Sequence, residues 1–317
     1  MKRVIKWTLG LVLLAVAGLF LWGYAPDTDP AAMRAKYASA TSRFVEVEPG
    51  LMLHVRDEGK RDGPVLVLVH GSNASLHTWE PWVKRLGGTY RIISFDQSGH
   101  GLTGPHPRGD YSAAAYVRTL DALMSKLGVT RFALAGNSMG GWVSWNYALA
   151  HPEKVSALIL VDAGGAPNST PPSLPIGYRL AYMPLVKNLL QVITPRSVIE
   201  KSVRQTLLVH APINDAMIDR YWEMIRMPGN RAATGPRLAV KRQPPTREQM
   251  ARLTMPTLVM WGAEDSLIPV TAADWFAGAI PGAQKLVYPG VGHIPMEEVP
   301  DRSASDVAAF LATVKIP

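Results

Sequence analysis

A serine stands between glycines where a strand-like run meets a helix-like run, and this segment limits the possible folds more than any other. It reads Gly136-Asn137-Ser138-Met139-Gly140-Gly141, after the apolar residues 131–135 and before the apolar residues 142–150. Glycine neighbours permit a tight, strained turn and leave the serine hydroxyl accessible. The helix that follows directs its N-terminal amides at the same point, where negative charge is stabilised. The pattern predicts an α/β fold in which Ser138 is a nucleophile.

An acid and a base are expected further along the chain. A serine hydroxyl is a weak nucleophile until a base removes its proton and a carboxylate orients that base. Residues 256–262 are typical of a buried strand and lead into Asp265, and residues 284–288 form a second such run before Gly292-His293. Functional groups in open α/β sheets gather at the carboxyl ends of parallel strands. The sequence therefore predicts a catalytic triad of Ser138, Asp265 and His293.

Two other carboxylates compete with Asp265. Asp162 ends the preceding strand-like run, residues 155–161, and Glu264 is the immediate neighbour of Asp265. Asp162 also suits a helix cap or a loop tie beside Gly164-Gly165. We expect Asp265 to orient the base and keep Asp162 and Glu264 as alternatives.

The remaining histidines have contexts that favour structural roles. His70 lies in a strand-to-loop turn, where its ring is expected to brace the loop, and His100 lies between two glycines. No strand-end geometry is expected around the others, His54, His77, His106, His151 and His210. A glycine precedes His293 and a helix-like run follows it, which favours His293 as the base.

Stabilising an oxyanion takes two backbone N–H groups, one from the residue after the nucleophile and one from the loop after an earlier strand. Met139 is the first of these. The strand-like residues 65–69 lead into His70-Gly71-Ser72-Asn73, and we expect Ser72 to supply the second. Asn73 is an alternative side-chain donor, although a turn role is expected for it.

Strand-like and helix-like runs alternate along most of the chain. Residues 44–48 and 51–57 meet at Pro49-Gly50 as a hairpin. The further expected strands, largely parallel and separated by helices such as 112–127, are 65–70, 90–96, 131–137, 155–162, 257–262 and 284–288. The pattern predicts a mostly parallel, doubly wound sheet. Its hydrolase core is expected in two parts, residues 43–165 and 255–317.

Five motifs in this order resemble those of the α/β-hydrolase superfamily, and more narrowly its branch of capped serine esterases and C–C-bond hydrolases. They are His70-Gly71, Asp96-Gln97-Ser98-Gly99-His100-Gly101, the segment around Ser138, Trp261-Gly262-Ala263-Glu264-Asp265 and Gly292-His293. The resemblance covers about residues 43–317 and implies an α/β-hydrolase fold.

The resemblance also narrows the chemistry. Relatives that open epoxides or cleave carbon–halogen bonds carry aspartate at the position of Ser138, so both activities are disfavoured. C–C-bond hydrolases of this branch place an aromatic residue after the catalytic histidine, whereas Ile294-Pro295 follows His293 in this sequence. Ester hydrolysis is therefore expected, with C–C-bond, lactone or amide cleavage and perhydrolysis on the same triad as alternatives. Acyl transfer to an alcohol, and a slow or non-catalytic ligand receptor, are alternatives of other classes.

The N-terminus predicts a membrane anchor at residues 1–25. Lys2, Arg3 and Lys6 precede an apolar run at residues 7–25, whose length approaches the ~30 Å of a bilayer core at ~1.5 Å per residue. Aromatic residues lie at its ends, and the basic cluster is expected to stay cytoplasmic, so that the catalytic domain lies outside the cytoplasm. The alternative is a cleaved signal peptide of a secreted or periplasmic protein. Residues 26–42, rich in Pro, Ala, Asp and Ser, are expected to be a linker.

Residues 166–254 interrupt the alternation and predict a helical cap over the serine. Helical patterns cover 176–193, 197–209 and 215–227. The candidate pocket-lining residues for an apolar substrate are Met183, Met217, Met224, Met227, Tyr178, Tyr182, Tyr221 and Trp222. The cap holds 13 Lys and Arg against 5 Asp and Glu, so it carries the whole net charge of +8. Such a patch suits an anionic membrane surface or an acidic substrate, or it is a solvated surface.

Composition excludes several classes of site. The chain has no cysteine, which rules out disulfides and thiolate metal sites. No zinc-ligand spacing and no phosphate-binding glycine loop occur, so neither a metal ion nor a cofactor is expected. Basic residues are not interleaved with aromatic ones along a groove, so nucleic acid is not an expected partner. The expected substrate is a small apolar ester.

Overall fold

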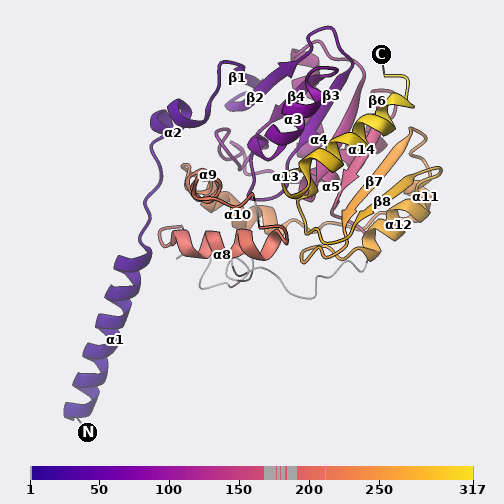
Figure 1. Cartoon of the computed structure of the whole chain (residues 1–317). Coiled ribbons are helices and arrows are strands. Elements are labelled where there is room, and N and C mark those ends of the chain that lie inside the picture. The colour runs from indigo at the N-terminus through magenta and orange to yellow at the C-terminus, as the bar shows by residue number, and fades with distance from the viewer. Residues whose placement is uncertain are drawn as a thin grey trace.

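An eight-stranded, mostly parallel sheet forms the centre of the protein (Figure 1). The computed structural model describes residues 2–167, 191–210 and 212–316, together with positions 176, 179 and 183. The sheet has the order β1-β2-β4-β3-β5-β6-β7-β8, with the bounds Ser42–Glu48 (β1), Leu51–Gly59 (β2), Val65–Val69 (β3), Arg91–Phe95 (β4), Phe132–Asn137 (β5), Val155–Val161 (β6), Thr257–Gly262 (β7) and Gln284–Tyr288 (β8).

Strand direction follows the predicted pattern. The strands from β3 to β8 pair in parallel, whereas β2 pairs antiparallel with both β1 and β4. The predicted hairpin of β1 and β2 turns at Gly50, which has a φ of 80°, a left-handed value that glycine adopts without strain. The prediction of a mostly parallel sheet is confirmed.

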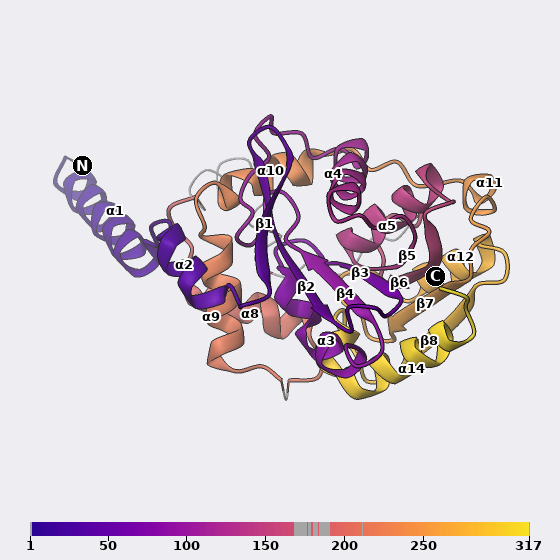
Figure 2. The same cartoon turned by 90° about the horizontal axis from the view of Figure 1, so that it is seen from above.

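Helices cover both faces of the sheet (Figure 2). On one face lie α4 (Ala113–Lys126), α5 (Met139–Ala150) and α12 (Thr271–Ala279). The other face is covered by α3 (Glu80–Leu86) and α14 (Pro300–Ala312). Two further short helices lie in the core outside the β6–β7 segment, namely η1 (Leu76–Trp79) and α13 (Pro295–Glu298). The sheet is therefore doubly wound.

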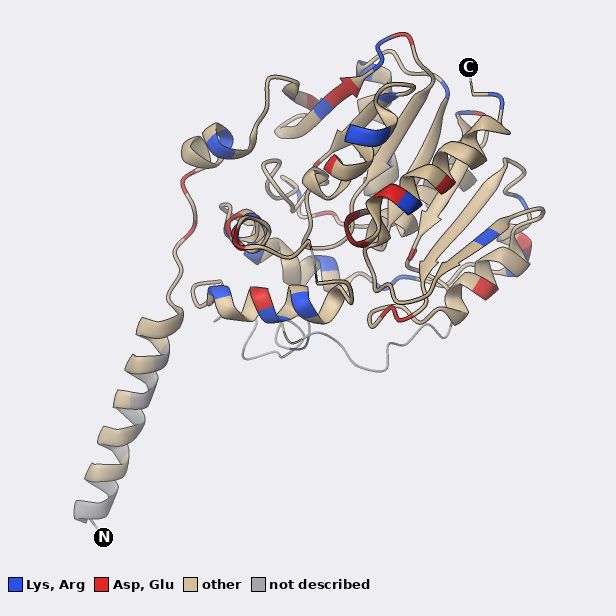
Figure 3. Cartoon of the chain, in the orientation of Figure 1, with Lys and Arg blue, Asp and Glu red and all other residues tan. Residues whose placement is uncertain are grey.

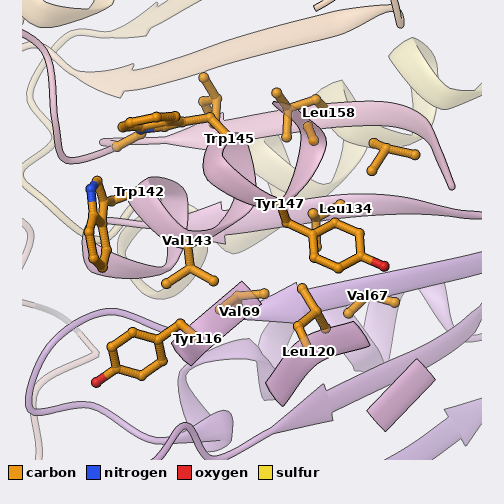
Figure 4. Packing of buried hydrophobic residues seen from close by; sticks show 14 of the residues in the cluster. Val67, Val69, Tyr116, Leu120, Leu134, Trp142, Val143, Trp145, Tyr147 and Leu158 are labelled. Carbon is orange, nitrogen blue, oxygen red and sulfur yellow. The ribbon is translucent and has the colours of Figure 1, made fainter. Parts of the chain in front are cut away.

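Helix α5 is almost entirely buried, and this burial determines where its N-terminus lies. Its Trp142, Val143 and Tyr147 pack among side chains of the sheet and of α4, including Val67, Val69, Leu134, Tyr116 and Leu120 (Figure 4). Burying a large apolar side chain contributes about 1.5–3 kcal/mol, so the helix is strongly held against the sheet. The residue before its first turn, Ser138, is positioned with it.

Among the described residues between β6 and β7 are four helices, α8 (Arg196–Thr206), α9 (Asp215–Ile225), α10 (Asn230–Ala239) and the short α11 (Arg247–Met250). We refer to residues 166–254 as the cap. The helices predicted at 197–209 and 215–227 correspond to α8 and α9. Most of the helix predicted at 176–193 lies outside the described residues.

The chain begins with α1 (Lys2–Gly23), which extends away from the rest of the molecule (Figure 1), and continues through α2 (Pro30–Tyr37). Within the part of the chain that the structure describes, no helix combines the length and the apolar character needed to cross a membrane. The prediction of a mostly parallel, doubly wound sheet is therefore confirmed, but that of a membrane-spanning helix at residues 1–25 is not.

Residues 24–37, which we call the N-terminal arm, lie against the cap. The N–H of Ala25 donates to the carbonyl of Val192 at 2.9 Å. The guanidinium of Arg231 on α10 donates to the carbonyl of Ala25 and to the carboxylate of Asp27, each at 2.6 Å. The segment predicted as a linker, residues 26–42, includes α2 and contacts the cap through Asp27.

Candidate functional site

Ser138 occupies the strained turn that the sequence predicts. It follows β5 directly, precedes α5 and has a φ of 55° and a ψ of −118°. A Cβ atom at Gly136 would collide with the carbonyl of Gly140, and one at Gly140 would collide with the carbonyl of Val69. Both glycines are therefore required where the turn packs against the sheet.

His293 and Asp265 form a buried pair. The Nδ1 of His293 donates to Asp265 Oδ2 at 2.7 Å, and the two side chains are 4% and 0% exposed. The other oxygen, Oδ1, accepts from the backbone N–H of Leu267 at 2.7 Å and of Ile268 at 3.1 Å. Within the described structure the Nε2 of His293 is buried and has no hydrogen-bond partner, although Ser138 and His293 line the same cavity. That nitrogen is left to act as an acceptor.

The loop that carries His293 is held from two sides. The amide of Asn137 donates to the carbonyl of His293 at 3.1 Å, and the N–H of His293 donates to the carbonyl of Thr206 in the cap at 3.1 Å. Asn137 precedes Ser138, so one residue joins the serine turn to the histidine loop. The sequence analysis did not identify this role of Asn137, because a side-chain contact over 156 residues leaves no local signal.

The rival carboxylates have other partners. Glu264 accepts from the backbone N–H groups of Gly290 and Val291, which ties two loops together. Asp162 is fully buried, and its Oδ1 accepts from the N–H of Gly262 at 2.9 Å. Only Asp265 accepts a hydrogen bond from His293 among the described carboxylates.

Met139 and Ser72 lie next to each other at the start of α5. The Ser72 hydroxyl donates to the sulfur of Met139 at 3.3 Å. Met139 is the first residue of α5, so its N–H has no acceptor within the helix. A Cβ atom at Gly71 would approach the Cβ of Ser138 to 3.0 Å, so the loop before Ser72 passes close to the nucleophile. The two backbones predicted to form the oxyanion site are therefore neighbours.

Asn73 and Arg237 link this loop to the cap. Asn73 has a φ of 58°, and its side-chain oxygen accepts from the guanidinium of Arg237 on α10 at 2.9 Å. Arg237 also contacts the Nε2 of His100. Burial, followed by the charge of Arg237, holds the pKa of His100 well below its usual value. Asn73 is thus a turn residue and a cap contact.

His70 braces the loop, as expected. It is fully buried, its Nδ1 donates to the carbonyl of Gly71 at 2.7 Å, and its Nε2 accepts from the N–H of Gln97 at 3.0 Å. Burial lowers the pKa of His70, so the neutral ring that this pattern requires is favoured. His54 is likewise structural, since its Nδ1 pairs with the buried Asp96 at 2.8 Å.

A cavity of about 140 Å³ opens beside Ser138 and His293. Its apolar lining comes mostly from the cap and includes Val198, Ile199, Val203, Leu207, Ile225, Leu267 and Ile294. Of the candidate lining residues, Tyr221 borders the cavity, whereas Met217, Met224 and Met227 pack in the core clusters. Trp222 does not border it, Met183 is exposed, and Tyr178 and Tyr182 lie outside the described residues.

The cap charge is partly neutralised by ion pairs. Two arginines of the cap pair with acids outside it, Arg220 with Glu297 at 3.2 Å and Arg231 with Asp27 at 2.6 Å. The acids that pair with Arg196, Asp215 at 2.7 Å and Asp219 at 2.6 Å, belong to the cap and are already counted in its net charge. Figure 3 shows both basic and acidic segments along α8. The excess of basic residues is therefore not all available to a partner.

Asp162, Asp265 and His293 each bring one possible ligand atom within 4.8 Å of the others. All three are buried, and the Asp265–His293 hydrogen bond already engages one atom of each. A metal ion at this cluster would have to compete with that bond.

A mostly parallel sheet with a strained serine and a hydrogen-bonded acid–base pair at the carboxyl ends of its strands is typical of α/β hydrolases. The chain belongs to the alpha/beta hydrolase fold family, whose model matches residues 64–300. An uncharacterized protein of Mycobacterium tuberculosis (strain ATCC 25618 / H37Rv) is 32% identical over 267 residues, which cover 80% of this chain and 76% of that protein.

Two relatives with named activities are also similar. A 2-hydroxy-6-oxononadienedioate/2-hydroxy-6-oxononatrienedioate hydrolase of Pseudomonas sp is 27% identical and covers 88% of this chain and 100% of its own. The crystal structure of a membrane phospholipase A, described as a bacterial virulence factor, matches with a TM-score of 0.73 and 25% identity over 99% of both chains. These relatives support a hydrolase function for the chain.

Proposed function

We propose that the chain is a serine hydrolase that cleaves small to medium apolar carboxylic esters through an acyl-enzyme. The observation that carries this proposal is the buried hydrogen-bonded pair of His293 and Asp265. The Nε2 of His293 has no hydrogen-bond partner among the described residues, and His293 lines the same cavity as Ser138. Apo hydrolases often have long serine–histidine separations that shorten when substrate binds.

The proposed reaction has two halves. The Oγ of Ser138 attacks the ester carbonyl carbon while the Nε2 of His293 takes the hydroxyl proton. The bond to the alcohol oxygen then breaks, and Nε2 returns the proton to the departing alcohol. Water repeats the sequence on the acyl-enzyme and releases the acid and the serine.

Asp265 holds His293 in the tautomer with its proton on Nδ1 and stabilises the imidazolium that forms. The backbone N–H groups of Met139 and Ser72 are the proposed donors to the oxyanion. Losing one such donor typically costs about 10²–10³ in turnover.

Substrate class is tested with a panel of purified substrates. It contains esters of graded acyl length, a lactone, an anilide and a vinylogous diketone of the kind that C–C hydrolases cleave. We expect turnover of the esters to exceed that of the others. Faster cleavage of the diketone would instead assign the chain to the chemistry of its Pseudomonas relative.

The nucleophile is tested separately. We expect Ser138→Ala to abolish hydrolysis and labelling by a serine-reactive phosphonate, because the acyl-enzyme needs that hydroxyl. Labelling of the variant at another serine contradicts the assignment.

We also propose that residues 1–25 anchor the protein in a membrane, with the catalytic domain on the non-cytoplasmic side. The sequence supports this through the basic residues before the apolar run at 7–25. The full chain should then stay in the membrane fraction through high-salt and alkaline washes, and external protease should reach the catalytic domain. If the mature chain is soluble and begins near Pro26, residues 1–25 are a cleaved signal peptide and the anchor proposal is contradicted.

The basic cap is proposed to add contacts to an anionic surface. A shortened chain for this test should begin at Gly23. This residue packs against Ile193 of the cap so closely that a Cβ atom would collide with it, and the arm that follows is also bound to the cap. We expect weak binding to anionic vesicles that physiological salt largely screens. If binding does not depend on the charge of the lipid, the basic residues of the cap form a solvated surface and the proposed contacts are contradicted.

A further inference from the structure

A second buried carboxylate lies beside the Asp265–His293 pair. Asp162 follows β6 with a φ of 44°, and its side chain is fully buried. An oxygen of Asp162, an oxygen of Asp265 and a ring nitrogen of His293 all lie within 4.8 Å of one another. The Oδ1 of Asp162 accepts from Gly262 N–H, but its buried Oδ2 has no hydrogen-bond partner among the described residues.

Two carboxylates this close in a buried site cannot both be ionised without a large repulsion, so the pair holds one proton. The two sides of the pair differ in how many donors they receive. Among the described residues, Asp265 accepts from two backbone N–H groups and from His293, whereas Asp162 accepts from Gly262 alone. Donors stabilise the ionised form, so the negative charge belongs on Asp265 and the proton on Asp162.

The surrounding groups act in the same direction. Burial raises the pKa of Asp162 well above its usual value, the charge of Asp265 and that of Glu298 on α13 raise it further, and only the N–H of Gly262 lowers it. On β8, Tyr288 also faces Asp162, but its hydroxyl donates to Asp306 at 2.8 Å.

We propose that Asp162 is a protonated carboxylic acid that donates a hydrogen bond from Oδ2 to the carboxylate of Asp265, and so positions the acid of the triad. The proposal rests on the serine hydrolase function proposed above. Asp162 is not among the described residues that line the cavity beside Ser138, so it is a positioning residue. Its hydrogen bond limits rotation of the Asp265 carboxylate and draws off part of its negative charge. The chain of groups becomes Asp162, Asp265, His293 and Ser138.

Asp162→Asn and Asp162→Gly in the full chain separate the possibilities. Asparagine tolerates a positive φ and can both accept from Gly262 and donate to Asp265, so it should rescue the function. Glycine also tolerates the positive φ but supplies neither bond. The readouts are kcat and KM for an ester, the pH dependence of kcat/KM, and the thermal unfolding midpoint.

We expect Asp162→Asn to keep kcat within about threefold, with the acid limb of kcat/KM unmoved, because a neutral group replaces a neutral group. Asp162→Gly should lower kcat by about tenfold or more with KM little changed. Its acid limb should move to higher pH, because Asp265 then interacts more strongly with His293. If Asp162 is ionised, Asp162→Asn removes a negative charge near His293 and moves the acid limb down by about one pH unit or more. That result, or a glycine variant with unchanged kcat and pH profile, overturns the proposal.

Infrared spectroscopy tests the proton without any turnover. At pH 8 the native chain should show the carbonyl band of a protonated carboxylic acid, and Asp162→Asn should remove it. The band will then be present even if the chain hydrolyses no ester, so failure of the proposed function is distinguished from failure of this inference. Absence of the band in the native chain, or its persistence in Asp162→Asn, contradicts the inference.

Discussion

The carboxylate of Glu298 accepts a hydrogen bond from the backbone N–H of Leu208 at 2.8 Å, and this contact joins the histidine loop to the cap. The same carboxylate also accepts from the N–H groups on either side of His293, those of Gly292 and Ile294, each at 3.0 Å. The position of the proposed base is therefore coupled to the position of the cap that lines the substrate cavity.

Glu298→Gln is expected to lower both stability and kcat. Glutamine turns an N–H₂ group toward backbone donors that need acceptors, and an unsatisfied buried donor costs about 1–3 kcal/mol. Thermal unfolding and ester turnover measure the effect. Glu153→Gln is the matched control, since the Glu153 side chain is 66% exposed. Equal behaviour of the two variants would contradict the coupling.

Asp265→Asn is expected to lower kcat by on the order of 10³–10⁴, because the amide no longer holds His293 in the required tautomer. Stopped or continuous ester assays measure it, and Glu264→Gln serves as a control on the neighbouring residue. A mild Asp265→Asn variant together with a crippling Asp162→Asn variant would assign the triad acid to β6.

Arg231→Ala is expected to release the N-terminal arm from the cap. The buried carbonyl of Ala25 would lose its donor, at a cost of about 1–3 kcal/mol, and residues 26–29 should become sensitive to protease. Asp27→Asn should cost less than about 1 kcal/mol, because the Asp27 side chain is 49% exposed. Unaltered proteolysis of Arg231→Ala would show that the arm is held by other contacts.

His77 is expected to make the fold sensitive to mild acid. Burial, with the charge of Arg56 acting in the same direction, lowers the pKa of His77 to about 4. The unfolded chain binds a proton there near pH 6.5 and the folded chain does not, so stability falls as the pH drops from about 6.5 to about 4. The full effect is on the order of 3 kcal/mol. Urea unfolding at pH 7.5 and 4.5 should show a smaller difference for His77→Gln, and an equal difference contradicts the prediction.

Metal removal is expected to leave the activity unchanged. Asp162, Asp265 and His293 lie close enough to hold an ion, but the proposed chemistry uses the Asp265–His293 hydrogen bond instead. Dialysis against a chelator, followed by an ester assay, is the measurement. A loss of activity that a divalent metal restores would reassign the cluster as a metal site.

The sequence determined the order of strands and helices, the serine turn and the candidates for acid and base. These are local features, because glycine spacing and apolar periodicity express what a short segment can adopt. Residues 136–141 predict a tight turn whatever sheet they belong to. Residues 257–262 likewise predict a buried strand from their own sequence, whichever strands lie beside them. The sequence favoured Asp265 as the acid but kept Asp162 and Glu264 as alternatives, because all three follow strand-like runs.

Only the tertiary structure decided which side chains meet. His293 pairs with Asp265, while Asp162 lies beside that pair with one backbone donor. Arg231 binds the N-terminal arm across 206 residues, and Glu298 joins the cap to the histidine loop across 90. Such contacts depend on how the sheet and its helices pack in three dimensions, and hydrogen bonds between distant residues leave no periodic trace in the sequence. The elements were therefore predictable from local physical chemistry, whereas the partners of their polar groups followed from the packing.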